Sequence, residues 1–215
     1  MAPFDAHRGP ARLLAGFAVI RVVVTGSECT GKTTLAEALA AHYGTTPVPE
    51  YARLFVAEKG AAPVYADVDA IARGQMALED KHAGLELRRT DPELETAGPG
   101  VPTTSSGDTR SLLIQDTDLL STVVYSKHYY GECPGWIERA LRKRAADLYL
   151  LAGIDVPWIP DGDQRDRGDR REEMQELFRA ALTAGALRYI DVCGTHEQRL
   201  RAAVAAIGRL TDQAV

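Results

Sequence analysis

The chain has 215 residues, of which 45% are hydrophobic and 26% are charged, so it can bury a core of ordinary size and is not disordered throughout. Its formal net charge of −5, from 25 basic and 30 acidic residues, argues against a broad basic surface for nucleic acid or an anionic membrane. We therefore expect neither a nucleic-acid partner nor a membrane partner.

The chain carries no signature of a secreted or membrane-spanning protein. It has no apolar run long enough to cross a bilayer, and its first residues lack a small-residue cleavage pattern. Cys29, Cys133 and Cys193 are far apart and fit neither a disulfide framework nor zinc-ligand spacing. We expect a cytoplasmic location, and the sequence leaves open whether the chain forms a homo-oligomer.

Short β-branched runs alternate with helical patterns along most of the chain. Residues 1–18 have no such period and are predicted to be an N-terminal extension, while 19–212 form a single predicted domain. The predicted strands are 19–25, 46–48, 112–116, 147–151 and 187–192, each followed by a helical pattern. Five strand–helix alternations predict an α/β fold, with a parallel sheet covered by helices on both faces.

Two segments interrupt this alternation. In residues 90–110, thirteen of 21 residues are Pro, Gly, Ser or Thr, which predicts a flexible insertion within the domain. Residues 155–171 follow the fourth predicted strand and are rich in arginine, aspartate and glycine. We expect this second segment to be a lid whose arginines, Arg165 and Arg170 among them, offset charge on a transferring phosphoryl group. A solvated loop of alternating charge is the alternative.

The first predicted strand leads into G-x-x-x-x-G-K-T at residues 26–33, which opens a predicted helix. Glycines in this motif let successive backbone N–H groups surround phosphate oxygens, and the helix N-terminus adds positive potential. Lys32 is expected to reach the β- and γ-phosphates, and Thr33 to ligate Mg²⁺. The predicted nucleotide-binding residues of this loop are Gly26, Ser27, Glu28, Cys29, Thr30, Gly31, Lys32, Thr33 and Thr34.

Carboxylates follow two other predicted strands at the edge where such sheets bind ligands. Asp116 is placed to hold the Mg²⁺ shell. Asp118 either binds substrate hydroxyls or caps the next helix, and the two roles are equally supported. Glu50 is placed to orient an acceptor hydroxyl or take its proton, the alternative being a first-turn glutamate favoured by the helix dipole. Arg199, after the last strand, is assigned to nucleotide binding.

Five motifs together resemble the ribosylnicotinamide kinase domain of a bacterial NAD-salvage and regulator family. They are T-G-S-E-C-T-G-K-T-T (25–34), E-Y-A-R (50–53), Q-D-T-D (115–118), Y-Y-G-E-C-P (129–134) and V-P-W-I-P-D-G (156–162). Their order and approximate spacing match over about residues 19–209. The phosphate loop alone is unspecific, whereas the combination of E-Y-A-R, D-T-D and P-W-I-P-D-G is much more telling.

The resemblance implies a P-loop kinase fold with strand order 2-3-1-4-5 and ATP-dependent phosphorylation of the ribose 5′-hydroxyl of nicotinamide riboside. By position, it assigns ATP and Mg²⁺ to Lys32, Thr33 and Asp116. It also assigns the nucleoside to Glu50, Tyr51, Asp118 and Trp158, and the lid to Arg165 and Arg170.

The chain departs from the family pattern in three ways. It has the 90–110 insertion, a longer spacing before the first lid arginine, and no adenylyltransferase motif H-x-G-H. Three functions therefore compete. A nicotinamide riboside kinase is favoured, a kinase for another nucleoside or hydroxylated metabolite comes second, and a nucleotide-binding regulator without kinase activity comes third.

Overall fold

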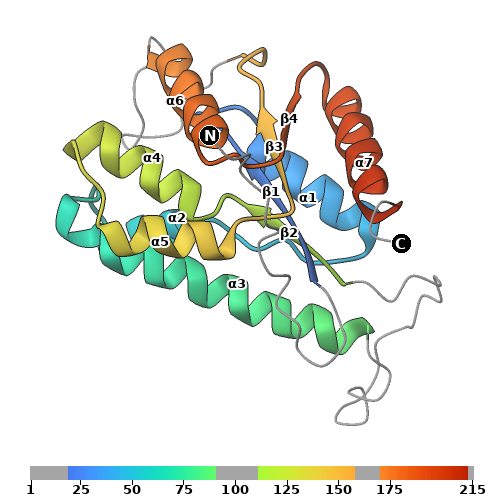
Figure 1. Cartoon of the computed structure of the whole chain (residues 1–215), viewed down its shortest axis with the longest axis horizontal. Coiled ribbons are helices and arrows are strands. Elements are labelled where there is room, and N and C mark those ends of the chain that lie inside the picture. Colours follow the sequence, from blue (N-terminus) through green and yellow to red (C-terminus); the bar gives the residue numbers. More distant parts are fainter. Residues whose placement is uncertain (1–18, 91–110, 158–169, 213–215) are drawn as a thin grey trace, which may run out of the picture.

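A computed structural model describes residues 19–90, 111–157 and 170–212 (Figure 1). The predicted N-terminal extension, the insertion from residue 91 onward and most of the predicted lid, 158–169, lie outside these residues. Trp158 and Arg165 belong to the part that is not described.

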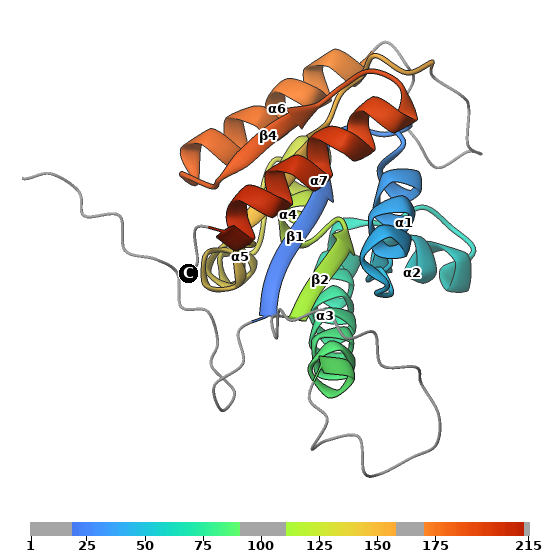
Figure 2. The ribbon, with the colours of Figure 1, turned by 90° about the vertical axis from the view of Figure 1, so that its right-hand side faces the viewer.

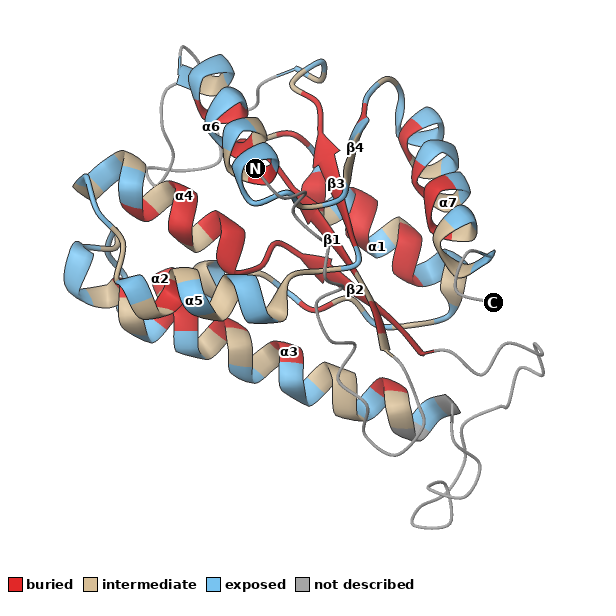
Figure 3. Cartoon of the chain, in the orientation of Figure 1, coloured by how far each residue is buried: buried red, intermediate tan, exposed pale blue. Residues whose placement is uncertain are grey.

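Within these residues, four parallel strands form the sheet, in the order β2-β1-β3-β4. They are β1 (Val19–Thr25), β2 (Ser111–Asp116), β3 (Leu148–Ala152) and β4 (Tyr189–Val192). In the centre of the sheet, Val22 of β1 lies opposite Ile114 of β2 and Leu148 of β3. All six residues of β2 and all five of β3 are buried, as expected for parallel strands covered on both faces (Figure 3).

The prediction of a five-stranded sheet was wrong at the second strand. Of residues 46–48 only Val48 pairs with β2: its N–H donates to the Ile114 carbonyl at 2.8 Å, and its carbonyl accepts from the Asp116 N–H at 2.9 Å. Pro47 and Pro49 flank Val48, and a proline has no N–H to donate to a ladder. Val48 nevertheless pairs with the edge of β2 that faces away from β1. The predicted order 2-3-1-4-5 places the second predicted strand at this edge.

Helices cover both faces of the sheet (Figures 1 and 2). They are α1 (Lys32–Tyr43), α2 (Tyr51–Lys59), the 3₁₀ turn η1 (Tyr65–Asp67), α3 (Val68–Thr90), α4 (Leu119–Tyr130), α5 (Gly135–Arg144), α6 (Arg171–Ala184) and α7 (His196–Asp212). Alternate residues of β1 point to opposite faces, so Val22 and Val24 pack with α1 and α7, while Val23 packs with α4 and α6. No helix of the described residues is long and apolar enough to cross a membrane.

Helix α2 packs against α3 through a close approach of the Tyr51 ring to Gly74. A Cβ added at Gly74 would lie 2.0 Å from Cε1 of Tyr51, whereas a Cβ at Gly84 of the same helix meets nothing within 4 Å. The Tyr51 N–H also donates to the Gln75 amide oxygen at 2.9 Å. Gly74 is therefore needed for the seating of α2 against α3.

The two glycines provide a matched test of this packing. Gly84→Ala should stabilise the protein by about 0.5–1 kcal/mol, because alanine has the higher helix propensity. Gly74→Ala should destabilise it by about 1–3 kcal/mol, because the new methyl group overlaps the Tyr51 ring. Chemical denaturation of both variants checks this, and equal stabilisation by both would contradict the described packing.

Candidate nucleotide and acceptor site

The phosphate loop joins the end of β1 to the start of α1, as the sequence predicted. Its backbone has positive φ at Gly26 (129°), Cys29 (52°) and Gly31 (77°). A side chain at Gly26 would also meet the Ala152 carbonyl at 3.0 Å, so this position has little room for one. Such a backbone directs successive N–H groups to one side, which is the arrangement that binds phosphate oxygens.

The carbonyls of the loop accept hydrogen bonds from charged side chains. Lys32 Nζ donates to the Ser27 carbonyl at 2.7 Å, and one guanidinium nitrogen of Arg171 donates to the Cys29 carbonyl at 2.8 Å. Burial lowers the pKa of Lys32, with the neighbouring Glu50 and Asp116 carboxylates acting in the opposite direction. Lys32 is thus buried beside carboxylates at the start of α1, within the loop where a phosphate-binding lysine is expected.

Arg199 lies behind the loop and is only 3% exposed. Its three side-chain nitrogens donate to the carbonyls of Thr30 (2.6 Å), Gly194 (3.0 Å) and Gly153 (3.0 Å), and it also pairs with Asp155. These contacts join the loop to the ends of β3 and β4. They favour a supporting role for Arg199, and its predicted direct contact with nucleotide stays a prediction.

Sequence reasoning missed two residues that support the loop, Arg171 and Gln175. Arg170 is exposed and pairs with Glu173 of its own helix at 3.6 Å, whereas its neighbour Arg171 is the arginine that reaches the loop. Gln175 accepts from the Ser27 N–H at 3.2 Å and donates to the Ala152 carbonyl at 3.0 Å. The arginine-rich run ends at Arg171, but composition alone could not decide which arginine turns inward.

Thr33 and Asp116, the two predicted metal ligands, lie together at the edge of the loop. The Thr33 hydroxyl donates to Asp116 Oδ2 at 2.6 Å, and Asp116 Oδ1 is buried without a hydrogen-bond partner in the described part of the chain. Burial raises the pKa of Asp116, and repulsion from Glu50 adds to this. A buried hard oxygen beside a hydroxyl fits Mg²⁺, which usually takes one or two protein ligands together with phosphate and water.

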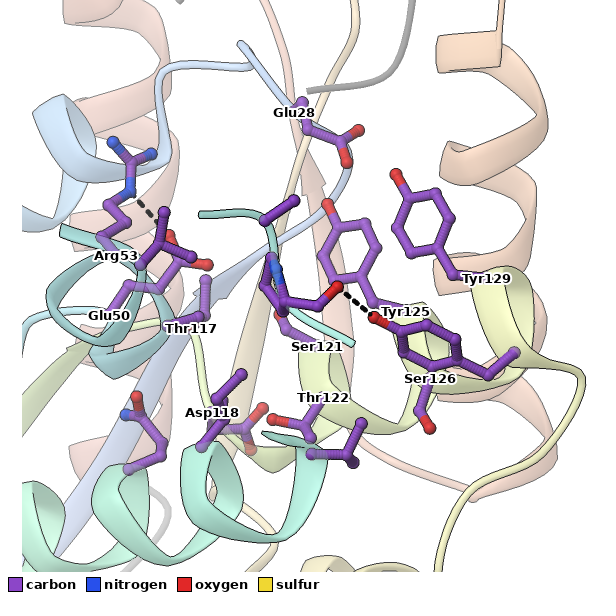
Figure 4. A pocket seen from close by; sticks show the side chains of 18 of the residues that line it. Glu28, Glu50, Arg53, Thr117, Asp118, Ser121, Thr122, Tyr125, Ser126 and Tyr129 are labelled. Atoms are coloured by element: carbon purple, nitrogen blue, oxygen red, sulfur yellow. Dashed lines mark hydrogen bonds and ion pairs between the residues drawn. The ribbon is translucent and has the colours of Figure 1, made fainter. Parts of the chain in front are cut away.

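A cavity of about 550 Å³ opens beside Lys32, between the phosphate loop, α2, α3 and α4 (Figure 4). It is lined by Glu28, Lys32, Glu50, Ala52, Arg53, Val56, Ala62, Pro63, Val68, Ile71, Gln75, Thr117, Asp118, Ser121, Thr122, Tyr125, Ser126, Tyr129 and Tyr130. Glu50 precedes the first turn of α2, and its carboxylate accepts from Arg53 Nε at 2.7 Å. This volume is in the range of sites for small molecules.

Asp118 takes the capping role that the sequence allowed, and its predicted contact with substrate hydroxyls stays a prediction. It caps α4, with Oδ1 accepting from the Leu120 N–H at 2.9 Å, and it also lines the cavity. Its other oxygen accepts from the Tyr149 hydroxyl at 2.8 Å. Burial, together with repulsion from Glu79, raises the pKa of Asp118 to about 7.

One predicted acceptor residue lies away from the cavity, and one residue of the phosphate loop reaches toward it. Tyr51 lies against Gly74 and is not among the residues that line the cavity. Glu28, predicted only as part of the phosphate loop, extends its side chain toward the cavity, where the hydroxyls of Tyr125 and Tyr129 also lie (Figure 4). Tyr129 belongs to the Y-Y-G-E-C-P motif, whereas sequence reasoning did not single out Tyr125.

Comparison with known proteins identifies the family. A family model described as "AAA domain" matches residues 21–199, which include the phosphate loop, the carboxylates of Asp116 and Asp118 and Arg199. The chain belongs to this family. The phosphate loop and the parallel sheet of this AAA domain give it a P-loop kinase-like fold.

The curated relatives confirm the resemblance drawn from the motifs. The chain is 26% identical over 185 residues to the trifunctional NAD biosynthesis/regulator protein NadR of Escherichia coli K12, and 26% identical over 185 residues to that of Salmonella typhimurium. Each alignment covers 82% of this chain but only 38% of the relative, so the chain matches a minor part of those proteins.

Solved structures agree on the fold. A structure of NadR protein in complex with NR superposes with a TM-score of 0.67 at 22% identity, covering 90% of this chain and 52% of that one. The complex of NadR protein with NAD and AMP-PNP gives 0.66 at 21% identity, over 90% and 50% of the two chains. Thymidylate kinase from Ehrlichia chaffeensis gives 0.54 at 14% identity, over 88% and 98%. At these identities the likeness shows the fold alone.

The high pKa of Asp118 leads to a prediction about stability. The unfolded chain releases the Asp118 proton near the ordinary pKa of 3.8, whereas the folded AAA domain holds it up to about pH 7. The free energy of unfolding therefore falls as the pH rises from 3.8 to about 7. Asp118→Asn keeps a good N-cap and removes the charge. The variant should match the wild type near pH 4 and exceed it at pH 8, by up to about 4 kcal/mol.

Denaturant titrations at pH 4, 6 and 8 measure this difference. A variant that is less stable than the wild type at pH 8 would show that the Asp118 carboxylate is ionised without penalty in the folded protein.

Proposed function

We propose that the protein is an ATP-dependent kinase that phosphorylates the ribose 5′-hydroxyl of nicotinamide riboside. The observation that carries the proposal is the cavity beside Lys32, because it adjoins the phosphate loop and is lined by the Glu50 and Asp118 carboxylates. The resemblance to NadR over 82% of the chain supports this acceptor. The identity of the acceptor, a cytoplasmic location and any homo-oligomer formation remain predictions.

The nucleotide side of the reaction uses groups that the structure brings together. In the proposal, backbone N–H groups of residues 26–33 bind the phosphates of ATP, and Lys32 adds a positive charge near the transferring group. Thr33 and Asp116 would hold Mg²⁺, which when bound offsets the charge that develops on the phosphoryl oxygens. Arg171, whose guanidinium donates to the Cys29 carbonyl, directly follows the predicted lid residue Arg170 in the sequence.

The acceptor side uses the two carboxylates in different ways. Glu50 is close enough to Lys32 and Asp116 to interact with their charges, so it lies at the phosphate end of the cavity. We assign it to orient the acceptor hydroxyl and to receive its proton. Asp118, fixed by Leu120 and Tyr149 and with a pKa of about 7, is assigned to ribose hydroxyls, because its carboxyl oxygens can accept hydrogen bonds from hydroxyl groups.

The function is tested by measuring ADP formation with ATP, Mg²⁺ and a panel of nucleosides. We expect nicotinamide riboside to stimulate ADP release far more than adenosine, uridine or thymidine. Lys32→Ala should abolish the stimulation while circular dichroism shows an intact fold, because Lys32 acts on phosphate. Stimulation by another nucleoside alone would identify a different kinase. No stimulation by any nucleoside would favour the nucleotide-binding regulator.

Glu50→Gln tests the role of the acceptor carboxylate. It should lower kcat by about 10²–10⁴-fold, the usual effect of losing general acid–base help, with the KM for ATP nearly unchanged. Glu58→Gln, the same substitution at an exposed position of α2, is the matched control and should keep wild-type kcat. Equal kcat values for the two variants would remove Glu50 from the chemistry.

A further inference from the structure

Helix α2 begins at the proposed acceptor carboxylate, yet that carboxylate does not cap the helix. Glu50 is the N-cap residue of α2, and its side chain makes no capping hydrogen bond. The carboxylate accepts from Arg53 Nε at 2.7 Å instead, and Glu50 lines the cavity (Figure 4). The first N–H groups of a helix have no partner within the helix itself, so α2 needs an acceptor from elsewhere.

Helix α3 supplies this acceptor. Gln75 is only 3% exposed, and its Oε1 accepts from the Tyr51 N–H, the first of α2, at 2.9 Å. A backbone N–H can only donate, so the amide oxygen of Gln75 must face it. The Gln75 side chain also interacts with the buried Glu79 one turn further along α3, and Glu79 pairs with Arg144 at 3.0 Å. Gln75 is thereby held between the start of α2 and a buried ion pair.

Hydrogen bonds fix the chain on both sides of Glu50. Before it, the Val48 carbonyl accepts from the Asp116 N–H at 2.9 Å, which ties this segment to the end of β2. After it, the Tyr51 N–H is held by Gln75. The position of Glu50 relative to Asp116, the proposed metal ligand, therefore depends on both hydrogen bonds.

We propose that Gln75 is a positioning residue for Glu50: it caps α2 in place of Glu50 and so leaves the Glu50 carboxylate to the acceptor hydroxyl. An N-cap side chain commonly accepts from the N–H groups of its own first turn. Without Gln75, the Glu50 carboxylate is drawn to those N–H groups and away from the cavity. The inference rests on the proposed function and adds the residue that keeps its acceptor carboxylate available.

Gln75→Leu tests this role, because leucine fills the buried position but offers the Tyr51 N–H no acceptor. With nicotinamide riboside it should lower kcat by about 10–100-fold, the effect of a small misplacement of a reacting group, with the KM for ATP nearly unchanged. Gln75→Met, which keeps an unbranched side chain, is the second variant and should give the same result.

Thr45→Val is the matched control. It removes the hydrogen bond from the Thr45 hydroxyl to Glu86, another buried polar residue of α3, and neither residue lines the cavity. This variant should be less stable than the wild type but keep the wild-type kcat.

A combination with Glu50→Gln separates positioning from a general structural effect. If Gln75 acts through Glu50, Gln75→Leu should change kcat less than about twofold in the Glu50→Gln background, because the group that it positions is already lost. An equal fold loss of kcat in both backgrounds, or a wild-type kcat in Gln75→Leu and Gln75→Met, would overturn the inference while the kinase function stands.

Denaturant unfolding tests the inference without any activity. Glu50→Ala should shift the unfolding midpoint little in the wild-type background, where Glu50 does not cap α2. In the Gln75→Leu background it should lower the midpoint clearly, because Glu50 has become the cap. If no nucleoside stimulates ADP formation, the kinase function fails, and this comparison still decides the role of Gln75. Unequal shifts in this direction would support it, and equal shifts would overturn it.

Discussion

A loop that turns its backbone N–H groups toward phosphate turns its carbonyls the other way, and buried carbonyls need donors of their own. In this protein the donors are the cationic side chains of Lys32, Arg171 and Arg199, which come from α1, α6 and α7. Two of these helices are distant in sequence from the loop. The position of α6 and α7 against the sheet is therefore tied to the conformation of a loop that follows the first strand.

The acceptor side depends on a second set of buried charges. Asp118 accepts from Tyr149, and behind it the buried Glu79 of α3 pairs with Arg144 of α5 at 3.0 Å and with Arg21 of β1 at 3.6 Å. Burial raises the pKa of Glu79 as it does that of Asp118. Carboxylates held in this way weaken the folded state without ligand, which is a common cost of a preorganised site.

Most elements were predictable because their signals are local. The run of β-branched residues in β1 predicted the bounds of this strand, 19–25, and the structure confirms them. The second strand could not be predicted correctly from the same signal, because Pro47 and Pro49 leave Val48 to make the pairing alone. The side chains that support the loop from behind, Arg171 and Gln175, also escaped prediction, since their partners lie more than 140 residues earlier.

The sequence by itself determined the phosphate loop, the α/β class and the carboxylates that follow β2, because each depends on short-range spacing or on the period of a single element. Only the tertiary structure decided where those groups point. It placed the N-cap residue Asp118 in the wall of the cavity, placed Tyr51 against Gly74 away from the cavity and turned Glu28 toward Tyr125. The direction of a side chain is set by packing between elements that are far apart in the chain, and a one-dimensional pattern does not contain that information.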